Sequence, residues 1–367
     1  EANLAVAIAV RLLNPGIPVI ARARTPSVAA NMASFGTDHI INPYARFAEY
    51  LGLAVASPER FRLIEMLTGL PETPLPEPHR PPAGRWILCG YGRFGHLLAT
   101  HLQPAGIDLT IIDPGCTDCV SPPTIRGNGT EAVTLLQAGI EGASGIIAGS
   151  DNDVNNLSIA MTASELKPSL FVVTRQNHSV NNPLFAAYNA DFTMVPGRIV
   201  AQECIAILTT PLLAAFLDLL RERDETWSGA LVVRLQALCD GRTPALWAVK
   251  LNIAGAQGAY RALMQGQRIA LGDILRDGTD RSQALPAATL LIRRGKELIL
   301  LPPDEFLLAA GDELLLASSL PARRNLELTL HNPNELDYVL TGSEVSGSWL
   351  WERFMRSGRP GAPAGEP

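Results

Sequence analysis

Three glycines within six residues are the part of this chain that could hold a phosphate-bearing ligand. The stretch GYGRFG, residues 90–95, has the pattern G-x-G-x-x-G and stands between an apolar run and a helical pattern. Glycine allows a tight turn and a close approach of the backbone to a pyrophosphate, and the helix N-terminus attracts the anion. We therefore predict that this loop binds a nucleotide through Gly90, Tyr91, Gly92, Arg93, Phe94 and Gly95.

An aspartate follows at the position expected for a ribose-binding acid. The apolar run DLTIID ends in Asp113, eighteen residues after Gly95. A carboxylate there accepts hydrogen bonds from ribose hydroxyls and repels a 2′-phosphate. The predicted cofactor is therefore NAD(H) or an adenine nucleotide such as ATP or ADP, rather than NADP.

Several polar residues follow the later strands and are expected to lie along the same edge of the sheet. Asn128, Asp151 and Arg175 are candidate ligand contacts, because ligands bind outside the carboxyl ends of such strands. Arg93 could reach a phosphate or be a solvated helix residue, and Arg175 could be structural instead. For Asp153 and Asn156 we favour capping and starting the next helix over ligand binding.

No residue pattern points to acid–base catalysis or to a metal. The histidines show no carboxylate partner, and a dehydrogenase needs a proton donor or acceptor beside its cofactor. The sequence therefore predicts a binding protein rather than an enzyme, with no catalytic and no metal-ligating residues. An NAD-dependent oxidoreductase is the alternative. The six histidines are His39, His79, His96, His101, His178 and His331.

The cysteine content favours a reducing compartment. Five cysteines are an odd number, which argues against a disulfide framework in a chain of this size. Cys116 and Cys119 form a C-x-x-C, but zinc needs two further ligands at a recognisable spacing. We interpret this pair as loop thiols.

The elements that position these residues alternate between strand and helix patterns. Such alternation predicts a doubly wound, Rossmann-like parallel sheet. The helices are expected over residues 93–103, 130–138, 153–166 and 180–188, followed by two more over 198–209 and 211–223. The strands are expected over residues 86–89, 109–112, 124–126, 145–148, 170–174 and 192–195.

An internal repeat relates the first 67 residues to a later part of the chain. Shifted by 153 positions, they align without a gap, so that Asn3 meets Asn156 and Arg22 meets Arg175. IPVIAR falls on LFVVTR and FGTDHIINP falls on YNADFTMVP. We infer two copies of one Rossmann-like unit, of which the first lacks its front half. Because the chain also begins with Glu1 rather than Met, we expect a trimmed piece of a longer protein.

These patterns divide the chain into five parts. The linker has six prolines in fifteen residues, which makes it stiff and extended. The runs ALVVRL, LWAVKL, TLLIRR, ELILLP and DELLLAS predict a small, β-rich α+β lobe. The parts are a partial first copy (1–69), the linker (70–84), a complete second copy (85–226), the C-terminal lobe (227–320) and a partly disordered tail (321–367).

Composition excludes several classes of protein. The chain is 47% apolar and 18% charged, which is typical of a globular protein. Its net charge of −6 and the lack of a basic block speak against a nucleic-acid partner. Its most apolar stretch, residues 3–20, is interrupted by charged and turn-forming residues and does not predict a membrane span.

These motifs resemble the regulator-of-conductance-of-potassium (RCK) domains of potassium channels and of Trk/Ktr-type potassium uptake systems. The resemblance rests on ILCGYGRFG, TIID, the stretch from GNGTEAVTLLQAG to DNDVNNL, FVVTR and AAGDELLLAS, and extends over about residues 1–320. One departure is Gly127-Asn128, where the family often has a Gly-Asp pair.

The resemblance implies a regulatory module without chemistry of its own. Nucleotide binding would change the packing of paired domains, in a dimer, a tetramer or an octameric ring. That change would reach a potassium channel pore or transporter subunit at the cytoplasmic face of the membrane. Regulation of a potassium-efflux antiporter is the alternative within transport. The resemblance assigns the family's phosphate-loop glycines to Gly90, Gly92 and Gly95, its loop arginine to Arg93 and its ribose acid to Asp113.

Overall fold

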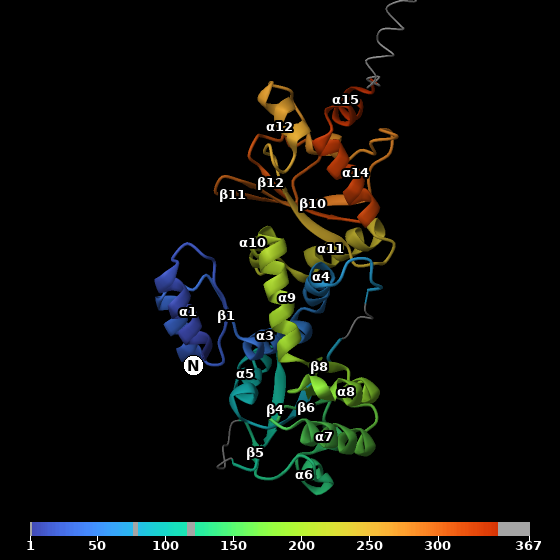
Figure 1. Cartoon of the computed structure of the whole chain (residues 1–367). Helices are drawn as coiled ribbons and strands as arrows, with labels where there is room; N and C mark the ends of the chain where they lie inside the picture. Colours follow the sequence, from blue (N-terminus) through green and yellow to red (C-terminus); the bar gives the residue numbers. More distant parts are fainter. Residues whose placement is uncertain (1, 76–79, 116–121, 344–367) are drawn as a thin grey trace, which may run out of the picture. The chain divides into compact units, whose positions relative to one another are not determined.

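A computed structural model of the chain describes residues 2–75, 80–115 and 122–343. They form two compact units, each considered by itself below (Figure 1). The first unit comprises Glu1–Thr68, Pro76–Leu208 and Leu220–Val232, and the second comprises Gly69–Leu75, Thr209–Leu219 and Val233–Pro367.

A six-stranded parallel sheet forms the centre of the first unit. Its spatial order is β5 (Thr124–Ile125), β4 (Ile107–Ile112), β3 (Gly84–Cys89), β6 (Gly145–Ala148), β7 (Phe171–Arg175) and β8 (Phe192–Met194). The chain proceeds outward from β3 in both directions, which confirms the doubly wound fold predicted from the sequence. Each expected strand agrees with the observed one to within two residues. The helices of this unit's second repeat are α5 (Arg93–Leu102), α6 (Ala132–Gln137), α7 (Asp153–Leu166) and α8 (Asn182–Tyr188).

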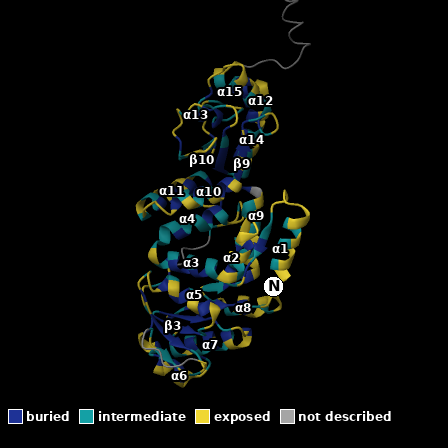
Figure 2. Cartoon of the chain, turned by 90° about the vertical axis from the view of Figure 1, so that its left-hand side faces the viewer, coloured by how far each residue is buried: buried dark blue, intermediate teal, exposed yellow. Residues whose placement is uncertain are grey.

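Both faces of this sheet are buried, because its strands are apolar on both sides. Trp86 and Leu88 of β3 lie in a cluster with Phe94 and Leu98 of α5. The alternate residue Ile87 lies in a second cluster on the opposite face, together with residues of α6 and α7. Figure 2 shows the dark blue of buried residues concentrated around β3.

The first repeat contains only the second half of the Rossmann-like fold. It contains α1 (Ala2–Leu13), β1 (Ile20–Arg22), α2 (Pro26–Ser34) and β2 (His39–Ile41), followed by α3 (Pro43–Ala56) and α4 (Pro58–Thr68). The corresponding elements after β8 are α9 (Pro196–Thr209) and α10 (Pro211–Leu220).

Equivalent hydrogen bonds confirm the repeat at the level of single atoms. Asn3 Nδ2 donates to Arg22 O at 3.0 Å, and Asn156 Nδ2 donates to Arg175 O at 2.7 Å. Val19 N donates to the Asp38 carboxylate at 2.7 Å. The pair 153 positions later, Val172 N and the Asp191 carboxylate, is also 2.7 Å apart. The register of β1 on β2 likewise becomes that of β7 on β8 when 153 is added to each number.

A helix of the first repeat covers the sheet of the second. Phe47, Ala48 and Leu51 of α3 belong to the same buried cluster as Phe94 and Leu98 of α5. The two helices approach closely at Gly52, where a Cβ would lie 3.0 Å from the carbonyl oxygen of His101. The two repeats therefore share one core, although they are separated in the sequence by the proline-rich linker.

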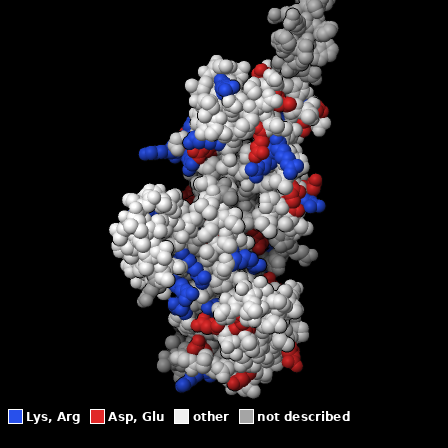
Figure 3. All heavy atoms as spheres, in the orientation of Figure 1, with Lys and Arg blue, Asp and Glu red and all other residues white. Residues whose placement is uncertain are grey.

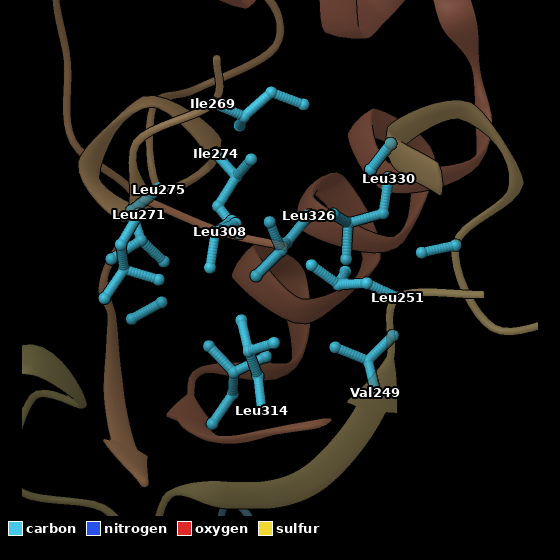
Figure 4. Packing of buried hydrophobic residues seen from close by; sticks show 14 of the residues in the cluster. Val249, Leu251, Ile269, Leu271, Ile274, Leu275, Leu308, Leu314, Leu326 and Leu330 are labelled. Carbon is cyan, nitrogen blue, oxygen red and sulfur yellow. The ribbon is translucent and has the colours of Figure 1, made fainter. Parts of the chain in front are cut away.

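The second unit is built on a four-stranded antiparallel sheet. Its order is β11 (Glu297–Leu300), β10 (Ala287–Arg294), β12 (Glu313–Ser318) and β9 (Ala245–Lys250). One face packs against α12 (Gln257–Met264), α13 (Leu271–Ile274), α14 (Leu320–His331) and α15 (Pro333–Thr341). Figure 4 shows Leu314 of β12, Leu326 of α14 and Ile274 of α13 meeting in this core.

Two expectations about this region need correction. The run ALVVRL is not a strand, because it lies in helix α11 (Glu225–Leu238). Its buried residues Leu231, Val232 and Leu235 are spaced for one helical face, and a short apolar run does not by itself distinguish a helix from a strand. In addition, α14 and α15 belong to the core of the lobe, which therefore extends past residue 320.

Other expectations lie outside the described residues. They concern the thiol pair Cys116 and Cys119, the middle of the linker at residues 76–79, and the end of the tail at residues 344–367. Within the described part of the chain, no single helix has the length and apolar character needed to span a membrane. Among the same residues, one bent pair of helices, α9 with α10, together has the length and apolar composition of a membrane span.

Candidate functional site

The glycine loop joins β3 to α5, and two of its glycines are required by its shape. Gly90 has a φ of +97°, a backbone conformation that disfavours residues with a side chain. A Cβ on Gly95 would lie 2.2 Å from the carbonyl oxygen of Gly90, so α5 could not pack this closely on the loop. Gly92 is different, since a Cβ there would meet no heavy atom within 4 Å.

Asp113 fixes this loop from the end of the neighbouring strand. Its Oδ2 accepts a hydrogen bond from Tyr91 N at 2.7 Å, and its Oδ1 accepts one from Gly115 N at 2.8 Å. A carboxylate has about four lone-pair sites, so both oxygens can still accept from a ligand. Asp113 therefore shapes the loop in addition to the ribose contact that we predicted for it.

A cavity of about 440 Å³ opens where β3, β4, β6 and β7 end, between the glycine loop and the loops after the other strands. This volume lies within the range of small-molecule sites. Of the ten predicted residues, eight line it: Gly90, Gly92, Arg93, Phe94, Asp113, Asn128, Asp151 and Arg175. The remaining lining residues are Tyr44, Cys89, Ile112, Pro114, Gly127, Gly129, Thr130, Gly149, Ser150, Asn155 and Ile159.

The two predicted residues that do not line the cavity have local roles. Tyr91 gives its backbone N–H to Asp113, and its ring lies 3.9 Å from the ring of His96, centroid to centroid. Gly95 allows the close contact with Gly90 described above. Both residues shape the loop from outside the ligand space.

Arg175 is the most highly connected side chain of the site. It is buried at the end of β7, and its Nη1 forms an ion pair with the Asp151 carboxylate at 2.8 Å. Its Nη2 donates to the hydroxyl oxygen of Tyr44 at 3.1 Å. The guanidinium also lies over the rings of Tyr44 and Phe94, 4.8 Å and 5.3 Å from their centroids. Its Nε is buried without a hydrogen-bond partner among the described residues.

Tyr44 was not predicted from the sequence. It lies at the start of α3 in the first repeat and lines the cavity of the second repeat. No motif or spacing identifies it, because the contact depends on how α3 packs against α5. Likewise, only the parallel sheet brings Gly127, Gly129 and Ser150 to this edge.

Arg93 and Asn128 face the cavity with few competing contacts. Arg93 is exposed, and no carboxylate of the described residues lies within ion-pair distance of it. Asn128 Nδ2 donates to Glu131 Oε1 at 3.3 Å, which leaves its amide oxygen for other donors. Both side chains are therefore able to contact a ligand.

The expectation for Asp153 and Asn156 is correct in part: Asp153 is the first residue of α7 and neither residue lines the cavity, but neither of them caps the helix. Asn152 caps α7, accepting hydrogen bonds from Val154 N and Asn155 N. Asp153 instead holds the loop after β7, where its carboxylate accepts from Asn177 N at 2.6 Å and His178 N at 3.0 Å. Burial acts to raise the pKa of Asp153, but hydrogen bonds from Asn181, Asn177 and His178 outweigh it and hold that pKa below its usual range.

Asn156 is buried and ties together two of the loops that line the cavity. Its Nδ2 donates to Ser150 O at 2.9 Å and to Arg175 O at 2.7 Å, and its Oδ1 accepts from Ser150 N at 2.9 Å. An amide is required here, because the same side chain faces both donors and acceptors.

The titratable groups of the cavity do not form a nucleophile with a base. Burial raises the pKa of the Cys89 thiol to about 12, so it is protonated at neutral pH. Histidine and lysine are absent from the described lining residues. The described part of the chain also contains no group of three or more His, Cys, Asp or Glu side chains placed to hold a metal ion.

Comparisons with known proteins match the region that carries this cavity. Residues 86–196 match the family model described as the TrkA-N domain, in agreement with the resemblance inferred from the sequence. Potassium channel protein 1 of Methanocaldococcus jannaschii is 26% identical over 147 residues, which are 38% of this chain and 44% of that protein. A Trk system potassium uptake protein TrkA homolog of Methanothermobacter thermautotrophicus is 28% identical over 134 residues, 35% of this chain and 62% of that protein.

The similarity covers only parts of these proteins. The chain spans less than two thirds of the length of the curated relatives it matches. Among solved structures, the GsuK RCK domain has a TM-score of 0.46 and 19% identity, over 90% of this chain and 78% of that one. The GsuK channel bound to NAD has a TM-score of 0.44 and 19% identity, over 89% of this chain and 65% of that one.

Proposed function

We propose that the cavity at the carboxyl edge of the six-stranded sheet binds NAD(H) or an adenine nucleotide such as ATP or ADP. The observation that carries this proposal is the combination, around one space, of the glycine loop, the N-terminus of α5 and Asp113. The space at Gly92 fits the proposal, since Gly92 lines the cavity and a Cβ there would meet no heavy atom within 4 Å.

Each part of the loop has a distinct task in this proposal. The backbone N–H groups at the start of α5 bind the phosphates, because a helix N-terminus carries unpaired donors and a partial positive charge. Asp113 accepts the ribose hydroxyls, and Arg93 adds a guanidinium on the phosphate side. Asn128, Asp151 and Arg175 contact the ligand from the other strand ends.

The nucleotide acts as a signal in this proposal and is not consumed. NAD(H), when bound, could supply hydride chemistry, but the described lining offers neither His nor Lys for proton transfer. The hydroxyl oxygen of Tyr44, which lines the cavity, accepts a hydrogen bond from Arg175. The favoured function is therefore binding coupled to a conformational change.

The conformational change would begin at Arg175. This residue contacts the cavity, the Asp151 carboxylate and Tyr44 of α3, so it connects the ligand space of the second repeat to a helix of the first. A ligand shifts a conformational equilibrium only by its difference in affinity for the two states. A hundredfold difference would correspond to about 2.7 kcal/mol.

The names of the curated relatives suggest what is regulated. One is called a potassium channel protein and others are called Trk potassium uptake homologs. We therefore propose that this chain regulates a potassium channel or potassium uptake system from the cytoplasmic face of the membrane. Its partners would be a membrane pore or transporter subunit and further copies of the regulatory domain.

Calorimetric titration of the purified chain with NAD, NADH, ADP and ATP tests the nucleotide site. We expect at least one of them to bind with micromolar affinity or better, and Asp113→Asn to weaken it by tenfold or more. Incubation with NADH or ATP should leave the nucleotide unchanged by absorbance and chromatography. Absence of binding by every adenine compound would refute the proposal, and steady turnover would refute its non-catalytic part.

A further inference from the structure

A second cavity adjoins the first and is lined by residues of both repeats. Its volume is about 550 Å³. Tyr44, Arg93, Asp151 and Arg175 line both cavities, so the two spaces meet at these side chains. The residues that line only the second cavity are Arg22, Arg24, Asn177, His178, Ser179, Val195, Pro196 and Gly197.

The side chains around this cavity carry an excess of positive charge. Four arginines line it, against the single carboxylate of Asp151, which is exposed and already paired with Arg175. Among the described residues, no carboxylate is within ion-pair distance of Arg22, Arg24 or Arg93. In Figure 3, several blue side chains meet in the lower half of the visible face, beside the white N-terminal part on the left.

Arg22 also lacks partners that its repeat equivalent has. Arg175, the equivalent residue 153 positions later, is held by Asp151 and by the ring and hydroxyl of Tyr44. The two residues therefore differ in the partners of their terminal guanidinium nitrogens.

The repeat explains why space remains beside Arg22. The position equivalent to Tyr44 in the second repeat is Gly197, at the start of α9. Gly197 provides no ring to cover Arg22, and a Cβ there would meet no heavy atom within 4 Å. The loss of one aromatic side chain between the copies therefore leaves an open space with arginines around it.

We propose that this second cavity binds a phosphate group with two negative charges. A guanidinium presents several donors in a planar fork that matches phosphate oxygens, and Arg22 and Arg24 bring two such forks from the first repeat. The phosphate is either the terminal one of a nucleotide held in the first cavity or part of a free anion such as pyrophosphate. For the nucleotide source, the inference rests on the function proposed above.

Titration of the whole chain with AMP, ADP, ATP and pyrophosphate distinguishes these sources. If the nucleotide supplies the phosphate, ATP should bind at least tenfold more tightly than AMP. If a free anion supplies it, pyrophosphate should bind to protein already saturated with AMP. The two results differ in where the phosphate comes from. Each supports the second cavity only if it depends on residues of that cavity, because the N-terminus of α5 can also bind nucleotide phosphates.

Two variants and a control connect the binding to this cavity. Arg24→Ala removes one exposed guanidinium and should weaken ATP or pyrophosphate about tenfold, with AMP changed less than twofold. Gly197→Tyr restores the ring found at position 44 and should have the same effect by filling the space. Arg80→Ala is the control and should leave the affinities for ATP and pyrophosphate unchanged, because this exposed arginine lies outside both cavities.

The outcomes separate this inference from the nucleotide site itself. If AMP and ATP bind equally well, pyrophosphate does not bind, and neither variant changes anything, the second cavity is not a phosphate site although the proposed function stands. If no adenine nucleotide binds but pyrophosphate binds and depends on Arg24, the proposed function fails and the anion site stands.

Discussion

Replacing Gly92 by aspartate should weaken nucleotide binding without destabilising the protein. Gly92 is the N-cap of α5, with a φ of −75° and a ψ of −164° that any residue can adopt. Aspartate caps a helix slightly better than glycine, and its charge near the helix N-terminus adds about 0.3–1 kcal/mol. Since a Cβ would meet no heavy atom within 4 Å, we expect the free energy of unfolding to be unchanged or slightly raised.

The same carboxylate would lie where the ligand's phosphates are expected. Two unit charges 4 Å apart repel by about 4 kcal/mol at an effective dielectric constant of about 20. Half of that, about 2 kcal/mol, would already weaken binding roughly thirtyfold. Gly92→Asn is the matched control, because asparagine has nearly the same size and capping ability without the charge.

Gly95→Ala, in contrast, should destabilise the protein. Its Cβ would lie 2.2 Å from the carbonyl oxygen of Gly90, so the loop and α5 must separate. Overpacking of this kind typically costs about 1–3 kcal/mol. Urea denaturation gives the stability of the three variants, and calorimetry with ADP or NAD gives their affinity. Wild-type affinity in Gly92→Asp, or wild-type stability in Gly95→Ala, would refute this description of the loop.

Two further predictions concern buried polar groups. Asn156→Asp should destabilise the protein by about 2 kcal/mol or more, because the new carboxylate would face the carbonyl oxygens of Ser150 and Arg175. Urea denaturation of the variant measures this loss, and an unchanged midpoint would contradict the prediction. Burial raises the pKa of Glu65 on α4 from 4.5 to about 7, so the folded state favours the protonated acid and stability should fall as the pH rises from about 5 to 8. After allowance for partial exposure, this loss should be about 1–2 kcal/mol. Glu65→Gln should remove that part of the pH dependence, and a variant that loses stability with pH as the wild type does would show that Glu65 is not its source.

Local patterns predicted much of the first unit because each pattern reflects one local requirement. The loop needs glycine at positions 90 and 95 for backbone reasons, and these requirements are visible in the sequence itself. ALVVRL shows the limit of such reasoning, since an apolar run of six residues suits a buried strand or one side of a helix equally well. In the structure this run lies in helix α11, and its residues Leu231, Val232 and Leu235 are buried.

The sequence by itself determined the parallel sheet, the repeat with its offset of 153, and eight of the nineteen residues that line the first cavity. These features depend on backbone conformation, periodicity and the rule that strand ends meet at one edge. Only the tertiary structure decided that Tyr44 contacts Arg175, that Asn152 rather than Asp153 caps α7, and that Arg22 and Arg24 line a cavity with residues of the other repeat. Such contacts depend on how helices pack across long separations in the chain, and no local pattern encodes that packing.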